Sequence, residues 1–231
     1  MIKATYINHM GDDNSVVNAA RVSFGKHSGR YTKEQNDRLI RFLAKHKHLS
    51  PFGHAFASFH VKAPIFVARQ LVKHKFLRWN EISRRYVDDE PEFYVPDVWR
   101  GRSADKKQGS EGVVDLESIY FQTDGWTPNL QSQIEILGEE QLETYKAMVD
   151  SGVAPEMARM LLPQSLMTEF YWSGSLDAFA AMCKLRCATD TQYESRIVAN
   201  QISETMGKLF PVSWEALIAE NTSRSPEHTK H

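Results

Sequence analysis

Residues 55–63 alternate between apolar and polar side chains, and this alternation constrains the fold more than any other feature of the sequence. Ala57, Phe59 and Val61 face one way, whereas Phe56, Ser58, His60 and Lys62 face the other. This period of two predicts a half-buried strand that ends at Pro64. Because proline is favourable at the first position of a helix, we expect a helix from Pro64 to about Lys75.

Similar patterns predict further elements along the chain. Strands are expected at residues 2–8, 83–87, 92–95 and 166–172. Helices are expected at residues 14–24, 33–46, 129–150, 155–162, 176–186 and 190–209. Thr32 and Gln35 form a capping-box pattern that opens the second of these helices, and Ser175 can cap the fifth. The mixed order of strands and helices favours the α+β class.

A length of 231 residues corresponds to one domain or at most two. With no internal repeat and no clear boundary, we expect a single domain over residues 1–220, followed by a flexible polar tail at 221–231. Residues 97–127 form a long polar insertion, with a short helix expected near 113–121. Loops of this length are usually functional lids or mobile insertions. A solvent-exposed loop without a function is an equal alternative.

The composition is that of a globular chain, with 42% hydrophobic residues and 28 basic against 29 acidic residues. A net charge of −1 argues against a surface devoted to nucleic acid. The longest apolar run, at residues 63–68, is far below the roughly 18 residues of a membrane span, and the N-terminus has no secretory pattern. Cys183 and Cys187 are four residues apart in a helical pattern, which is too wide for a disulfide. We therefore expect reduced, buried thiols in a cytoplasmic protein that binds no membrane.

The twelve glycines contain no pair at the G-x-G spacing, so the sequence has neither the dinucleotide-binding turn nor the Walker loop. The H-E-x-x-H and G-x-S-x-G motifs of zinc proteases and esterases are also missing from the sequence. A nucleotide cofactor would therefore need a different kind of pocket.

Residues 69–85 hold the densest positive charge, because six of these 17 residues are Lys or Arg and Glu81 is the only acid. On the expected helix, one edge carries Arg69, Gln70, Lys73 and His74. Cations at this density repel one another unless an anion lies among them, and phosphates are the obvious candidate.

Other interpretations of these residues stay open. The cations could complement a helix dipole on a solvated face, or they could form a nucleotide- or RNA-binding module in which Trp79 and Tyr86 stack on bases. Five histidines between positions 46 and 74 leave open a metal-dependent hydrolase, but no spacing among them fixes a metal site, and we expect none. His48 lies in a turn suited to reach a pocket or simply to stabilise the turn, and His60 is expected to be a sheet histidine.

The run Lys73-His74-Lys75, followed after seven residues by Ser83, resembles the signature of the flavin-dependent thymidylate synthases, which is Arg-His-Arg, seven residues and Ser. Asn80-Glu81 before the serine and Arg85-Tyr86 after it fit the same signature. Further segments similar to the family lie at residues 19–24, 48–54, 59–70, 158–163, 168–170 and 185–194. The similarity extends over most of residues 1–212 and excludes 97–127, and motifs in this order are highly specific together.

The resemblance implies a central, mostly antiparallel sheet flanked by helices, and a homotetramer whose active sites are shared between subunits. It also implies reductive methylation of dUMP to dTMP. In that reaction 5,10-methylenetetrahydrofolate supplies the carbon, NADPH reduces a bound FAD, and the reduced flavin provides the hydride. The resemblance further implies that FAD binds in a fold particular to this family and not in a Rossmann fold. This agrees with the lack of Rossmann glycines in the sequence.

The resemblance also implies the site residues. Arg186 is expected to stabilise the anion formed at the N3/O2 edge of uracil, which pushes electron density toward C5. Ser83 and His48 complete the candidate catalytic set; no base is evident beside Ser83, so a ligand contact is preferred to a nucleophile, and His48 is placed near the flavin or the folate. The dUMP-binding residues would be Gln70, Lys73, Glu81, Ser83, Arg84, Arg85, Arg159 and Arg186. The FAD-binding residues would be Ser50, Lys73, His74, Lys75, Glu81, Ser175 and Asp177.

Some residues depart from the family pattern. Lysines replace both arginines of the triplet, which keeps the charge but loses the planar fork that binds phosphate in a bidentate way. Asp177, Ala181 and Asp190 stand where the family commonly has Arg, Asn or His, and His, respectively. These three positions lie where the family completes its FAD site from another subunit, so we expect altered flavin affinity rather than a different reaction.

Overall fold

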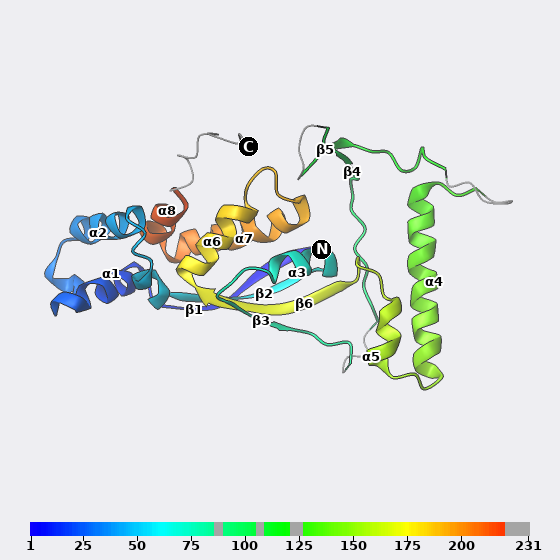
Figure 1. Cartoon of the computed structure of the whole chain (residues 1–231), viewed down its shortest axis with the longest axis horizontal. Coiled ribbons are helices and arrows are strands. Elements are labelled where there is room, and N and C mark those ends of the chain that lie inside the picture. The colour runs from blue at the N-terminus through cyan, green and yellow to red at the C-terminus, as the bar shows by residue number, and fades with distance from the viewer. Residues whose placement is uncertain (86–89, 105–108, 121–126, 220–231) are drawn as a thin grey trace, which may run out of the picture.

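The computed structural model describes residues 1–85, 90–104, 109–120 and 127–219, so the tail expected at 221–231 lies outside the described residues. Four strands form one antiparallel sheet in the order β1–β2–β6–β3 (Figure 1). The strands are β1 (Lys3–Met10), β2 (Phe56–Pro64), β6 (Met167–Ser175) and β3 (Leu77–Glu81). The predicted α+β class with an antiparallel sheet flanked by helices is confirmed.

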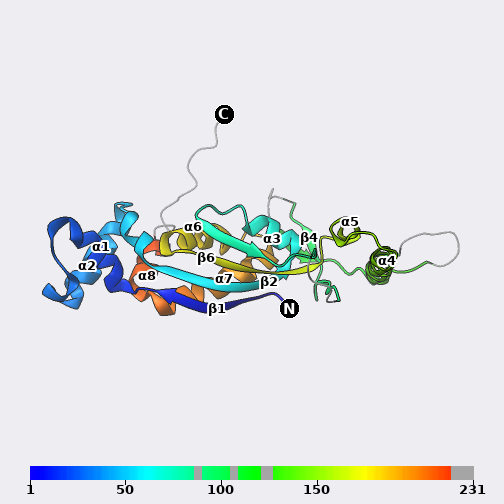
Figure 2. The ribbon, with the colours of Figure 1, turned by 90° about the horizontal axis from the view of Figure 1, so that it is seen from below.

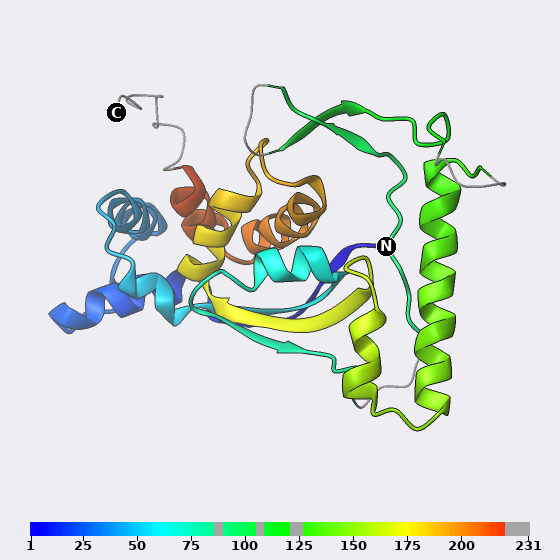
Figure 3. The same ribbon diagram turned by 45° about the vertical axis from the view of Figure 1, so that its right-hand side comes forward.

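The sheet has one apolar and one polar face. On the apolar face, β2 buries Ala57, Phe59 and Val61 as the alternation predicts. The helices α3 (Ile65–Leu71), α6 (Leu176–Arg186) and α7 (Tyr193–Leu209) lie over this face (Figures 1 and 3), and in Figure 2 the strands lie in front of these helices. On the polar face, Nε2 of His60 lies 3.0 Å from Oε2 of Glu169, as suits a sheet histidine.

An aromatic cluster fixes the edge strand β3 to its neighbour β6. Trp79 of β3 is paired in register with Trp172 of β6, and their rings meet edge to face at 5.8 Å. The Trp79 ring also stacks on Phe170, with 3.5 Å between the ring centroids. Trp172 and Phe170 are almost fully buried, so the short strand β3 is held by burial as well as by its backbone hydrogen bonds.

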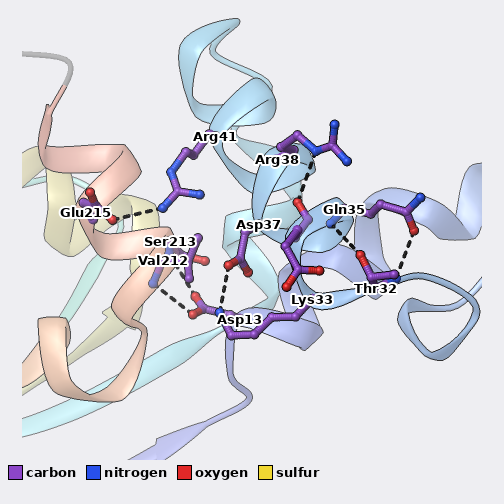
Figure 4. Close-up of polar contacts among 11 residues, drawn as sticks. Asp13, Thr32, Lys33, Gln35, Asp37, Arg38, Arg41, Val212, Ser213 and Glu215 are labelled. Atoms are coloured by element: carbon purple, nitrogen blue, oxygen red, sulfur yellow. Dashed lines mark hydrogen bonds and ion pairs between the residues drawn. The ribbon is translucent and has the colours of Figure 1, made fainter.

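Three helices pack together at one end of the sheet, namely α1 (Asp13–Arg21), α2 (Lys33–Lys45) and α8 (Pro211–Ala219). The capping box of Thr32 and Gln35 is confirmed (Figure 4). The Asp13 carboxylate accepts hydrogen bonds from the backbone N–H groups of Val212 and Ser213, each at 2.9 Å. Asp13 thereby satisfies N–H groups that the first turn of α8 leaves unpaired.

Helix α8 is absent from the sequence prediction, which treated Pro211 only as the end of the preceding helix. In the structure Pro211 is the first residue of a new helix, where its missing N–H costs nothing. The preceding helix α7 begins at Tyr193 rather than at residue 190. Proline therefore ends one helix and begins the next, with only Phe210 between them.

The other end of the sheet carries the segment from residue 97 to the start of β6. It contains a hairpin of β4 (Arg100–Arg102) and β5 (Ser110–Val113), then α4 (Leu130–Asp150) and α5 (Pro155–Ala158) (Figure 3). Helix α4 is confirmed. The short helix expected near 113–121 is wrong for the described residues 113–120, because Val113 ends a strand and no helix follows it before Phe121, which is not described.

The predicted helix from Pro64 to Lys75 is too long. Pro64 has an extended backbone and still pairs with Met167, so the helix starts one residue later and ends at Leu71. Residues 72–76 form a turn in which Phe76 has a positive φ of 65°, and β3 follows at once. Lys73 and His74 therefore lie on a turn and not on the expected helical edge.

The extended segments expected after this helix are also displaced. The strand lies at Leu77–Glu81, ahead of the predicted 83–87, because Leu77 and Trp79 pack on β6. Ser83 follows the end of β3, residues 84–85 form a turn, and residues 86–89 lie outside the described part of the chain. Near the predicted strand 92–95, Phe93 forms an isolated antiparallel bridge with Leu166.

Gly174 leaves no room for a side chain where β3 begins. A Cβ atom there would lie 2.4 Å from Cδ2 of Leu77 and 3.1 Å from the backbone oxygen of Phe76. Because a backbone oxygen cannot rotate away, Gly174→Ala is expected to lower the free energy of unfolding by about 1–3 kcal/mol in urea denaturation. Gly138→Ala is the control, because a Cβ on that helical residue meets nothing within 4 Å and its stability should not fall. Equal stability of the two variants would contradict the close approach of β3 and β6.

Candidate active site

The first cluster of predicted site residues surrounds a cavity of about 360 Å³ beyond the end of β3. The polar lining combines the chain that follows β3 with the 3₁₀ turn at Arg159–Leu161. It comprises Glu81, Ser83, Arg84, Arg85 and Arg159, together with Thr168 of β6. Ile65, Leu162, Leu166 and Met167 supply apolar walls. Three guanidinium groups and the Ser83 hydroxyl around a small cavity form a donor set for a phosphate group.

Hydrogen bonds hold the polar groups of this first cluster in place. Oγ of Ser83 accepts from the backbone N–H and from Nε of Arg85, both at 3.3 Å. Glu81 is anchored to the sheet, because Oε1 accepts from Oγ1 of Thr168 at 2.6 Å and Oε2 accepts from Nε1 of Trp79 at 3.1 Å. The neighbours of the Ser83 hydroxyl are thus arginine donors, which favours ligand contact over nucleophilic attack.

The second cluster lies at the opposite end of β3 and contains Arg186, His74 and Gln70. Arg186 ends α6, and its Nε donates a hydrogen bond of 2.9 Å to Nε2 of His74. The Gln70 amide nitrogen lies 3.5 Å from Oε1 of Gln192, while its Oε1 atom is buried without a partner among the described residues. This cluster therefore offers a fixed guanidinium group beside an unused acceptor.

His74 must be neutral to accept the hydrogen bond from Arg186, so the proton is on Nδ1. Burial and the adjacent Arg186 cation lower the pKa of His74 to about 4. Burial also lowers the pKa of Arg186, which nevertheless stays protonated near pH 7. Neutral His74 thus orients the guanidinium group without adding a second charge.

The depressed pKa of His74 predicts a loss of stability in acid. In the unfolded state the His74 imidazole is protonated below its ordinary pKa of 6.5, whereas in the folded state it is protonated only below about pH 4. The free energy of unfolding should therefore fall as the pH decreases from 6.5 to 4. Because the group is only half buried, we expect a loss of about 1–2 kcal/mol, measured by urea denaturation at pH 7 and pH 5. His74→Asn should show a shallower pH dependence between these values, and an equal dependence in both proteins would contradict the assignment.

The remaining predicted residues lie in the turn around His74, in the segment after α2 and at the start of α6. Lys73 and Lys75 are exposed in the turn after α3, and His48 and Ser50 are exposed after α2. Ser175 stands at the N-cap position of α6 without making the side-chain capping bond that its position suggests. Asp177, in the first turn of α6, has a buried Oδ1 atom without a partner in the described structure.

The predicted residues thus fall into two clusters within one chain. Arg85 and Arg159 lie beyond the end of β3, and His74 with Arg186 lies at its start. Five strand residues at about 3.3 Å each separate the clusters by at least roughly 13 Å along the strand. Within one chain, the two clusters therefore lie at opposite ends of β3.

Sequence reasoning missed an ion pair that docks the β4–β5 hairpin near the second cluster. Arg100 of β4 pairs with the buried carboxylate of Glu194, and its guanidinium group lies 4.1 Å from the centre of the Tyr193 ring. Glu194 belongs to a segment similar to the family, but Arg100 lies in the polar insertion, and no sequence spacing joins them. The insertion is thereby connected to the start of α7, beside Gln192.

A second cavity, of about 1580 Å³, adjoins Arg186 between the ends of α2, α6 and α8; we call it the α2–α6 cleft. Its charged lining residues are Arg41, Lys45, Lys47, Lys184, Arg186, Asp190 and Glu215. The free thiols Cys183 and Cys187 also line it, the first buried and the second half-buried, whereas the sequence predicted that both are buried.

No group of three or more His, Cys, Asp or Glu side chains within the described ranges is arranged to hold a metal ion. In the same ranges, no helix has both the length and the apolar character needed to cross a membrane.

An antiparallel sheet that carries cationic clusters beside two cavities is suited to an enzyme that acts on phosphorylated small molecules. A sequence model of the family described as "Thymidylate synthase complementing protein" matches residues 5–212. A flavin-dependent thymidylate synthase of Thermus thermophilus is 40% identical over 211 residues, covering 91% of this chain and 73% of the relative. One from Kosmotoga olearia is 38% identical over 209 residues, covering 90% of this chain and 86% of the relative. The chain belongs to the flavin-dependent thymidylate synthase family and is a flavin-dependent methyltransferase.

Solved structures agree with this assignment. The crystal structure of the UMP/dUMP methylase PolB from Streptomyces cacaoi, bound with 5-Br dUMP, has a TM-score of 0.79 and 29% identity, covering 95% of each chain. The same enzyme bound with 5-Br UMP has a TM-score of 0.78 and 31% identity, covering 95% of this chain and 94% of that one. The similarity therefore includes nearly the whole chain.

Proposed function

We propose that this chain catalyses the reductive methylation of dUMP to dTMP, with 5,10-methylenetetrahydrofolate as the carbon donor, NADPH as the reductant and FAD as the flavin. The single observation that carries the proposal is the gathering of Glu81, Ser83, Arg84, Arg85 and Arg159 around one small cavity. These are residues that the resemblance to the family assigns to the nucleotide, and they come from segments more than 70 residues apart in sequence.

The first cluster is proposed to bind the dUMP phosphate. Arg84, Arg85 and Arg159 supply charge, and the Ser83 hydroxyl can donate a hydrogen bond to phosphate while it accepts from Arg85. Glu81 is held by Thr168 and Trp79, so its carboxylate is kept at a fixed place beside these cations. Gln70 and Lys73 are proposed to contact the same nucleotide from the second cluster.

Arg186 is proposed to be the catalytic residue that contacts the pyrimidine. A guanidinium group at the N3/O2 edge stabilises the anion of the ring, and the negative charge that this leaves at C5 makes that carbon a better nucleophile. His74 acts as a positioning residue, because its neutral Nε2 fixes Nε of Arg186 at 2.9 Å and leaves the outer nitrogens of the guanidinium group for a ligand.

The residues near the second cluster fit a flavin dinucleotide. Lys73 and Lys75 supply charge for phosphates, and Ser50 supplies a hydroxyl. The buried, unpartnered oxygen of Asp177 is an acceptor for a ligand N–H or O–H group, and Ser175 has its hydroxyl free of a capping bond. His74 and His48 are proposed to contact the cofactor here, with His48 facing the flavin or the folate, and Glu81 is proposed to contact it from the first cluster. The bound flavin supplies the hydride of the reaction.

A homotetramer with shared active sites is part of the proposal. It is supported by the separation of the two clusters along β3, because residues needed at one ligand can converge when a second copy contributes one cluster. A cytoplasmic location, and a single domain that includes the 97–127 segment, are proposed on the same family grounds. The alternative of a nucleotide- or RNA-binding module loses its basis, since the basic segment belongs to the signature of an enzyme family.

The titles of the related methylase structures name both UMP and dUMP, so UMP is a second candidate substrate. The test uses purified protein supplied with FAD, NADPH and 5,10-methylenetetrahydrofolate, and it measures methylated product from dUMP and from UMP separately. We expect a yellow protein that forms dTMP. Methylation of UMP alone would revise the substrate, and a protein that stays colourless and methylates neither nucleotide would contradict the proposal.

A further inference from the structure

Among the described residues, more basic than acidic side chains line the α2–α6 cleft. Five cationic residues line it, against the two acids Asp190 and Glu215. Arg41 pairs with Glu215 across the cleft, with 3.3 Å between Nη2 of Arg41 and Oε2 of Glu215 (Figure 4). Within the described ranges, the ammonium groups of Lys45 and Lys47 have no ion-pair partner. Like charges gathered in one cleft repel one another unless an anion binds there.

Lys47 occupies a backbone position that normally belongs to glycine. The backbone N–H of His48 donates to the oxygen of Leu43 at 2.9 Å, and that of Lys47 donates to the oxygen of Ala44 at 3.1 Å. This pair of bonds is a Schellman motif, which places Lys47 at the left-handed residue after the C-cap, with φ of 58°. A residue with a Cβ atom is strained there, so a lysine at this position points to a role for its side chain.

The size and position of the cleft favour a large anionic ligand. Its volume of about 1580 Å³ exceeds the roughly 300–1000 Å³ of pockets for drug-sized ligands, so it can accept a dinucleotide. The cleft is continuous with Arg186, and therefore with the second cluster of the candidate site. A diphosphate carries two negative charges in a short span, so two cationic residues that line the same cleft are suited to bind it.

We propose that Lys47, together with Lys45, binds the diphosphate of the flavin adenine dinucleotide in the α2–α6 cleft. The inference rests on the proposed function, because it takes FAD as the flavin, and it adds to the cofactor site two residues outside the signature triplet. The backbone of Lys47 is fixed by the hydrogen bonds of the helix end, so little backbone order has to be gained when the phosphates bind.

The test measures flavin binding to the flavin-free full-length protein by quenching of flavin fluorescence, with FAD, FMN and riboflavin as three separate probes. Lys47→Gly and Lys47→Ala are expected to raise the dissociation constant for FAD about tenfold. Their affinity for riboflavin, which has no phosphate, should equal that of the wild type. Lys47→Arg should retain FAD affinity because it retains the charge. Lys26→Ala, which removes an exposed lysine that does not line the cleft, should also leave FAD affinity unchanged.

Thermal unfolding of the same flavin-free variants separates the backbone strain from the charge. Lys47→Gly should raise the melting temperature by about 2–4 °C, because glycine fits the left-handed position, whereas Lys47→Ala should not. A variant that gains stability while it loses FAD affinity cannot owe that loss to misfolding. Higher stability together with weaker FAD binding is the result expected for a residue whose backbone strain is retained because its side chain binds a ligand.

Wild-type affinity for FAD in Lys47→Gly, or an equal loss for all three flavins, would overturn the inference. Unchanged FAD affinity with slower reduction by NADPH would assign the cleft to the reductant and would also overturn it. A wild-type protein that binds no flavin and forms no dTMP would contradict the proposed function itself, and the inference would fall with it. A wild-type protein that binds FAD while Lys47→Gly binds it equally well would contradict the inference alone.

Discussion

Replacing Arg186 with alanine is expected to lower the turnover number for dTMP formation about 10²–10³-fold. The guanidinium group is half buried at the end of α6 and is fixed by a 2.9 Å hydrogen bond to neutral His74. A fixed cation stabilises developing charge on a pyrimidine better than water does, because water must reorient during the reaction. Loss of this charge should therefore affect the chemical step more than the binding of dUMP.

Steady-state kinetics at saturating dUMP, with flavin content measured for each preparation, check this prediction for Arg186. Arg186→Lys is the matched variant: it keeps a positive charge but lacks the Nε donor and the planar fork, so only partial activity should return. His74→Gln retains an acceptor for Arg186 and should lose less activity than Arg186→Ala. A turnover number within about twofold of the wild type in Arg186→Ala would show that another group stabilises the pyrimidine anion.

Replacing Trp172 with alanine is expected to lower the free energy of unfolding by about 3–5 kcal/mol. The side chain is 1% exposed and contacts the rings of Trp79, Phe170 and Phe179 at centroid distances of 5.7–6.1 Å. The loss includes the transfer of a large apolar group and the cavity that remains in the centre of the sheet. A typical protein is stable by only about 5–15 kcal/mol, so much of the total stability would be lost.

Urea denaturation followed by circular dichroism measures this effect. Tyr171→Ala is the control, because Tyr171 is the next residue on β6, points to the opposite face and is 55% exposed. It should change stability by no more than about 1 kcal/mol. A loss for Trp172→Ala as small as that for Tyr171→Ala would contradict the placement of the aromatic cluster. Because Trp79 lies on β3, Trp172→Ala should also weaken the binding of dUMP beyond the end of that strand.

The elements that the sequence predicts well are those whose pattern is local. The alternation in residues 56–62 and the capping box at Thr32 both depend on neighbours within a few residues, and the structure confirms both. The end of α3 at Leu71 depends instead on β3 pairing with β6, a contact about 95 residues away in sequence. No local signal required the chain to leave the helix before Lys73.

The candidate site shows the same division between local and distant contacts. The signature around Ser83 and the separate family segment at residues 158–163 predicted residues that the structure gathers at one cavity, among them Arg159. The hydrogen bond from Arg186 to His74 and the ion pair from Arg100 to Glu194 join residues that share no sequence pattern. The left-handed backbone at Lys47 was also beyond prediction, since glycine is the usual signal for that position.

The most direct test of a site built from two copies of the chain is complementation between two inactive variants. Arg85→Ala removes a residue of the first cluster, and Arg186→Ala removes one from the second. When both are co-expressed with different tags and the mixed oligomer is purified, about a quarter of the sites should combine two intact clusters, so dTMP formation should return to roughly that fraction of the wild-type rate. A mixed oligomer no more active than its two parents would contradict the shared site.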